Sequence, residues 1–157
     1  MTRTVDHSSF EVEHLYRFKP EQVFKAWSDP KALSTWGSPG EGWRSNLKAF
    51  EFKVGGEQVT EFGPEGGPTF VNQSRYCDIV PNTRIVMAGS LSQGDIVQFV
   101  GVLTVTFASD GTGCRLRLTE QGVFLDGHDV PDNHRAGWES MLQRLEADWL
   151  AHAATDA

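Results

Sequence analysis

The feature that most constrains this sequence is an unbroken succession of strand-like segments between Asn46 and Gln121. Apolar and polar residues alternate in each segment, as in a half-buried strand, and Gly, Pro, Asn or Asp separates it from the next. Parallel neighbours would need crossover helices, and no helical pattern intervenes. The sequence therefore predicts a meander of antiparallel strands at residues 46–54, 57–62, 70–80, 83–91, 96–108 and 114–121.

The residues before this run predict one strand and two short helices. Residues 10–18 alternate in strand fashion. Pro20 suits the first position of a helix, because its fixed φ is already helical. Asp29 can cap a second helix, which Pro30 opens and Gly37 ends.

A long amphipathic helix is predicted at about residues 131–152. After Pro131, apolar side chains recur at intervals of three and four residues, which places them on one face of a helix. This face carries Trp138, Met141, Leu142, Leu145 and Trp149. The predicted sheet also has one apolar face, so the simplest packing wraps the sheet around this helix.

This order of elements predicts an α+β fold, with a curved antiparallel sheet of six or seven strands around the C-terminal helix. We expect one domain over residues 1–157, with the polar residues 1–9 frayed. A strongly curved sheet that holds one helix cannot close its interior completely. We therefore expect a cavity between helix and sheet, where ligand sites tend to form.

Five segments have an order and spacing that resemble a known superfamily. They are FEVEHLYRFKPEQVFKAWSDPKALSTW, the Gly55-Gly56 turn, RYCDIVPNTRIV, LTEQGVF and the terminal GWESMLQRLEADWL. Together they resemble the START-like helix-grip superfamily (SRPBCC). More narrowly, they resemble the branch named after the C-terminal domain of the heat-shock-protein-90 ATPase activator. The resemblance extends from about Phe10 to Leu150.

The resemblance implies a helix-grip fold with a largely apolar cavity, which the superfamily uses for lipids, hormones and polyketides. It does not imply one reaction, because the superfamily includes binding proteins, cyclases, hydrolases and chaperone partners. It also implies a link to the stress response. The co-chaperone has a second domain that this chain lacks, which argues against chaperone activation.

The charge balance argues against some classes of partner. The chain has 14 Lys and Arg residues against 21 Asp and Glu residues, a formal net charge of −7, and no basic run. Nucleic-acid binding is not expected, because contacts with phosphates need clustered cations. There is no apolar run long enough for a membrane span and no apolar N-terminal segment typical of a secretion signal. We therefore expect a cytoplasmic protein with no membrane partner and with reduced Cys77 and Cys114.

Inward-facing apolar side chains are the first candidates for a ligand site. The ordinary alternative is a solid core, but the resemblance favours a cavity of about 300–1,000 Å³. No glycine-rich phosphate-binding motif is present, and we expect no cofactor. The predicted lining residues are Tyr16, Phe99 and Leu103 from strands, Trp138, Met141, Leu142 and Leu145 from the helix, and Trp36 and Trp43 at one end.

Glu120 is the most informative polar candidate. It shares the strand phase of Leu116 and Leu118, so alternation directs its carboxylate inward. There it could bind a ligand hydroxyl or amine, or act as a general base with a pKa raised by burial. We favour the structural alternatives, which are exposure to solvent through a bulge at Gly122 or pairing with an Arg.

Two histidines could share the same space. His14 lies on the strand face of Tyr16, and His134 begins the apolar stripe of the last helix. A lone inward histidine is more often a hydrogen-bonded core residue than a catalyst. His134 is the better candidate, since the start of the helix is where we expect the cavity mouth. Glu120, His134 and His14 are therefore our candidates for acid–base catalysis.

Residues 124–135 concentrate side chains of the kinds that bind metals. The spacing matches no metal site that we can defend, so we expect none. We predict instead that Asp126 and Gly127 form a turn and that Asp129 or Asp132 caps the last helix. The side chains concerned are Asp126, His128, Asp129, Asp132 and His134.

Three functions follow from these observations. The leading hypothesis is a binding protein and not an enzyme, which holds a small hydrophobic or aromatic molecule between sheet and helix. The second is an enzyme of the polyketide-cyclase or hydrolase type that uses cavity acid–base residues. The third is an interaction module that contacts a chaperone or a second copy of the chain through aromatic residues at Trp36 and Trp43.

Overall fold

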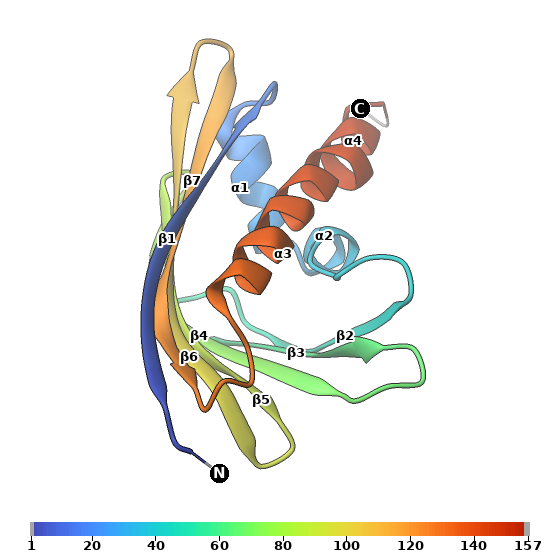
Figure 1. The fold of residues 1–157 in the computed structure, drawn as a ribbon. Helices are drawn as coiled ribbons and strands as arrows, with labels where there is room; N and C mark the ends of the chain where they lie inside the picture. Colours follow the sequence, from blue (N-terminus) through green and yellow to red (C-terminus); the bar gives the residue numbers. More distant parts are fainter. Residues whose placement is uncertain (1, 156–157) are drawn as a thin grey trace.

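The computed structural model describes residues 2–155 and contains one seven-stranded antiparallel sheet, as predicted. The sheet curves around the C-terminal helix (Figure 1). Its order is β1-β7-β6-β5-β4-β3-β2, so the first strand pairs with the last and the others form the expected meander. The strands are β1 (Val5–Tyr16), β2 (Trp43–Phe50), β3 (Glu57–Pro64), β4 (Phe70–Val80), β5 (Arg84–Gln93), β6 (Ile96–Asp110) and β7 (Gly113–Leu125).

The first and last strands are longer than their alternation predicts. We expected residues 1–9 to be frayed, whereas Val5 already pairs with Leu125. The register between β1 and β7 stays continuous through Gly122, which pairs with Ser8 and forms no bulge there. Backbone pairing accounts for the added length, because the N–H and C=O groups of each strand gain partners in the other.

The two short helices begin and end where the sequence predicts. They are α1 (Pro20–Ser28) and α2 (Pro30–Trp36), each with proline in its first turn. The Asp29 carboxylate accepts hydrogen bonds from the backbone N–H groups of Lys31 and Ala32, at 2.8 and 3.4 Å. Gly37 ends α2.

The long C-terminal helix is also present. It comprises α3 (Pro131–Arg144), a π-helical segment η1 (Leu145–Leu150) and α4 (Ala151–Thr155). No helix among residues 2–155 is long and apolar enough to cross a membrane. The predicted cap by Asp129 or Asp132 is wrong, because the residue at the N-cap position is Val130, which has no side-chain cap.

The solid core lies where α1 and α2 pack beside the long helix (Figure 1). α1 contacts β6, β7 and η1, and α2 contacts β2, α3 and η1. Val23 of α1, Leu116 of β7 and Leu145 of η1 are fully buried there. Because the two short helices fill the space between sheet and helix only at this end, the other end stays open.

Glycines at equivalent positions of β6 and β7 make room for an aromatic ring. Gly89 pairs with Gly101, which in turn pairs with Gly122. A Cβ atom on Gly101 or Gly122 would lie 2.5 or 2.7 Å from the Phe99 ring. The close approach at these two glycines is made by a side chain. The Phe99 ring lies next to these two glycines and also packs against His134 of α3.

Candidate functional site

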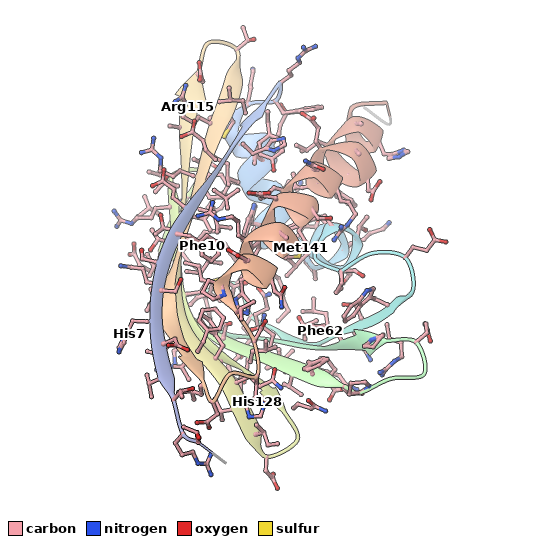
Figure 2. All side chains as sticks on the ribbon, viewed as in Figure 1. His7, Phe10, Phe62, Arg115, His128 and Met141 are labelled. Carbon is pink, nitrogen blue, oxygen red and sulfur yellow. The ribbon has the colours of Figure 1, made fainter. Side chains whose placement is uncertain are left out.

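A cavity of about 780 Å³ lies between the sheet and the N-terminal half of the long helix. Figure 2 shows Met141 on α3 above Phe62 on β3, on opposite sides of this space. Aromatic and uncharged polar side chains make up most of the wall. The lining includes Trp27, Trp36, Trp43, Gln58, Phe62, Phe70, Asn72, Met87, Leu91, Gln98, Phe99, Leu103, Glu120, His128, Asp129, His134, Trp138 and Met141.

Most of the residues that the sequence places at a ligand site line this cavity. Whether they touch a ligand stays a prediction. The eight that line it are Trp36, Trp43, Phe99, Leu103, Glu120, His134, Trp138 and Met141.

Three predicted lining residues belong to the solid core instead. Tyr16, Leu142 and Leu145 are almost completely buried and do not border the cavity. The Tyr16 hydroxyl donates a hydrogen bond of 2.9 Å to the Leu142 carbonyl, which ties β1 to the long helix. Inward alternation alone does not separate these residues from the cavity wall, because both kinds of residue face the same side of the sheet.

His14 is also not among the described residues that line the cavity. Its ring packs against Tyr16, with ring centroids 4.3 Å apart. Burial lowers the pKa of His14, against an opposing effect of Glu146. His14 therefore does not join the other two acid–base candidates.

Glu120 is buried, with 8% of its surface exposed. Both structural alternatives that we favoured for it are wrong, since β7 has no bulge at Gly122 and the partners of Glu120 are not arginines. One carboxylate oxygen lies 2.5 Å from His134 Nδ1. The other accepts a hydrogen bond of 2.9 Å from the indole Nε1 of Trp138.

His134 lies between two carboxylates. Its Nδ1 faces Glu120, and its Nε2 lies 2.7 Å from Asp129 Oδ2. The edges and faces of Phe99 and Phe124 enclose the imidazole, with centroids 4.7 and 4.8 Å away. Burial alone would lower the pKa of His134, but hydrogen bonds with Asp129 and Glu120 raise it to about 9.

The geometry also defines the charge of this cluster, which we call the Glu120–His134–Asp129 cluster. Both imidazole nitrogens face carboxylate oxygens, and only the protonated ring can donate from both. Although burial opposes it, hydrogen bonding to His134, Asn133 and Val130 lowers the pKa of Asp129. One imidazolium between two carboxylates leaves one net negative charge at the cavity wall.

Sequence reasoning missed the role of Asp129. We assigned it to helix capping, whereas one of its oxygens accepts from Val130 N and Asn133 Nδ2 and the other meets His134. A clue was present, because His134 follows Asp129 by five residues across the start of a helix. The sequence did not show that β7 places Glu120 at the other ring nitrogen of His134, Nδ1.

The remaining acidic and histidine residues of this segment do not form a metal site. Within residues 2–155, no group of three or more His, Cys, Asp or Glu side chains is arranged to hold a metal ion. Asp126 instead accepts from Arg3 at 2.9 Å and from Thr4 N at 3.0 Å. Asp126 and Gly127 form the predicted turn, both with positive φ.

Two tryptophans near the cavity differ in how their N–H groups are used. The indole N–H of Trp36 donates to the Ala26 carbonyl at 2.8 Å. The Trp27 ring stacks on Trp138 with centroids 6.0 Å apart, but its buried N–H has no partner in the described part of the chain. Trp36 is 1% exposed, so it offers no aromatic surface to a partner protein; Trp43 is 40% exposed.

Two solved structures of bacterial proteins resemble this protein in both sequence and fold. The crystal structure of the Mll3558 protein from Rhizobium loti is 35% identical, with a TM-score of 0.82 over 92% of this chain and 98% of that one. A putative uncharacterized protein from Rhizobium leguminosarum is 29% identical, with a TM-score of 0.85 over 94% of this chain and 97% of that one.

A more distant structure shows the same fold. The AHSA1-like protein from Aeromonas hydrophila is 20% identical, with a TM-score of 0.71 over 93% of this chain and 94% of that one. The search of curated proteins found no significant match. The family model described as "Activator of Hsp90 ATPase homolog 1-like protein" matches residues 17–148. The chain therefore belongs to this family and to the START-like helix-grip superfamily.

Proposed function

We propose that this protein binds a small hydrophobic or aromatic molecule in the cavity between the sheet and α3. The observation that carries the proposal is a space of about 780 Å³ next to a fully packed core. Ligand pockets are typically about 300–1,000 Å³, mostly apolar, with a few polar groups that orient the ligand. Here aromatic rings supply the apolar wall, and the Glu120–His134–Asp129 cluster supplies the polar end.

A second candidate is an enzyme that uses Glu120 and His134 in acid–base chemistry. The contact between the two side chains favours it. However, a general base must reach the proton that it takes, and both nitrogens of His134 already face carboxylates. Binding is the better supported of the two functions, and contact with a chaperone or a second copy of the chain stays a prediction.

Ligand screening tests the proposal directly. Native mass spectrometry of the purified protein would detect a copurified molecule. Titration with lipids and aromatic polyketides is expected to change tryptophan fluorescence and to raise the melting temperature, because a ligand that binds only the folded state stabilises it.

A matched pair of variants locates the binding site. Leu91→Trp adds a ring to the cavity wall and is expected to weaken binding, because the added volume competes with the ligand. Val100→Trp adds the same ring at an exposed position of β6 outside this cavity and should leave binding unchanged. Equal affinity of both variants for a ligand would place that ligand elsewhere and contradict the proposal.

A further inference from the structure

We infer that the cavity selects molecules in which an apolar or aromatic body carries a positively charged amine, and that it discriminates against carboxylates. This inference rests on the proposed function, because it names the class of molecule that the same cavity takes. It is based on where the charges of the cavity wall lie and on which of their hydrogen-bonding positions are already used.

The Glu120–His134–Asp129 cluster is negative whichever form its histidine takes. With the imidazolium that the hydrogen bonds favour, its net charge is one negative unit, and transfer of that proton to a carboxylate would leave the net charge unchanged. The side chains of Glu120 and Asp129 are 9% and 16% exposed, and both residues border the cavity. A cation at this end of the cavity would therefore meet uncompensated negative charge.

An anion would find no comparable partner there. None of the described residues that line the cavity is Lys or Arg. The two arginines of α3 are not among the described lining residues: Arg135 lies over the Phe10 ring and donates to the Glu11 carbonyl. Both hydrogen-bonding contacts of Arg144 are within the protein, to Ser140, which borders the cavity, and to the backbone of Ser38.

The histidines of the wall do not change this balance. His134 has both nitrogens engaged by carboxylates and has none left for a ligand anion. His128, the remaining ionisable side chain in the described lining, is exposed in the loop before α3 (Figure 2). A carboxylate in the interior would thus lose its hydration without gaining a buried cation.

The carboxylates retain the capacity to accept a hydrogen bond from an amine. A carboxylate has about four lone-pair positions, and the contacts with His134 and Trp138 use two of those on Glu120. The Trp138 ring lies beside Glu120 and stacks on Trp27, which adds aromatic faces that attract cations. The apolar body of the ligand would extend toward Phe62 and Met141.

Three probes that share one ring system test the inference: naphthylmethylamine, naphthalenemethanol and naphthoate. Isothermal titration at about pH 6 keeps the amine charged and the histidine protonated. We expect the amine to bind about tenfold more tightly than the alcohol, and the carboxylate most weakly, because charge-assisted hydrogen bonds are the stronger ones. Equal affinities, or tightest binding of naphthoate, would overturn the inference and leave the proposed function standing. Failure of all three to bind would contradict both.

Substitution of one carboxylate identifies the source of the preference. Glu120→Gln is expected to abolish the advantage of the amine over the alcohol while retaining binding of the alcohol. Glu61→Gln is the matched control, because Glu61 is a carboxylate of β3 outside the cavity that pairs with Lys48 at 3.8 Å. If Glu120→Gln does not fold, Asp129→Asn removes the other negative charge. A tenfold preference for the amine that survives in these cluster variants would overturn the inference.

Discussion

The two halves of the long C-terminal helix face the same sheet but meet different surroundings. Leu145 and Leu150 of the C-terminal half are buried in η1, which contacts α1 and α2. His134, Trp138 and Met141 of the N-terminal half border the cavity. The difference teaches that the cavity does not result from a weak apolar stripe. It results from the two short helices, which fill only one end of the space that the curved sheet leaves.

The largest expected difference between the halves is in packing energy. Leu145→Ala removes a fully buried side chain and should lower the free energy of unfolding by about 2–5 kcal/mol. Met141→Ala enlarges an existing cavity and should cost less than about 2 kcal/mol, because fewer contacts are lost. Urea unfolding measures both. Equal losses would mean that the N-terminal half is packed as tightly as the core.

The second prediction concerns the pH dependence of stability. The pKa of His134 is about 9 in the folded protein and ordinarily 6.5, so the folded state holds this proton more tightly. The resulting stabilisation, roughly 3 kcal/mol, is complete below pH 6.5 and is lost as the pH rises to about 9. Urea unfolding at several pH values measures it.

His134→Gln serves as the control, since it should flatten the pH dependence in that window. Direct titration of His134 by NMR gives the same information if this variant is too unstable. A midpoint at or below the ordinary pKa of histidine would show that the cluster does not hold the proton.

A smaller effect is expected when one partner of the cluster is made neutral. Glu120→Gln should destabilise the protein by about 1–3 kcal/mol, because a charged hydrogen bond to His134 is lost. The pKa of His134 should fall at the same time. Glu61→Gln, at an exposed pair, should change stability by less than about 1 kcal/mol. An unchanged His134 pKa in Glu120→Gln would contradict the contact.

The smallest effect compares the two indoles that border the cavity. Trp36→Phe removes a hydrogen bond to the Ala26 carbonyl, whereas Trp27→Phe removes an N–H group that has no partner in the described residues. Both remove similar volume, so Trp36→Phe should cost about 1 kcal/mol more. Thermal unfolding measures the difference, and a larger loss for Trp27→Phe would point to a hidden partner.

The sequence predicts the features of the molecule that depend on local pattern, and it does not predict those that depend on long-range pairing. Alternation and helical spacing report local phase, and proline, aspartate and glycine mark the helix ends. The strands, the two short helices and the long helix could therefore be predicted. The extra length of β1 and β7 could not, because it depends on pairing between residues that are distant in the chain, such as Val5 and Leu125.

The candidate site was only partly predictable for a related reason. Glu120 and His134 could be placed on inward-facing positions, but phase does not say which two inward side chains meet. Strand alternation at Tyr16 and helical spacing at Leu142 also could not show whether these residues lie in the solid core or line the cavity. Their surroundings depend on where α1 and α2 end, which is a property of the assembled fold.

The Glu120–His134–Asp129 cluster has a consequence for how specificity can diverge among related chains. It joins β7 to the start of α3, so the charge that faces a ligand also anchors one wall of the cavity. A substitution there alters affinity and wall position together. Uncharged lining residues of the sheet such as Asn72 and Leu91 form no ion pair that ties the sheet to α3. Among related chains, we therefore expect changes of ligand preference to occur at uncharged residues of the sheet that line the cavity. The Glu120–His134–Asp129 cluster is expected to stay unchanged.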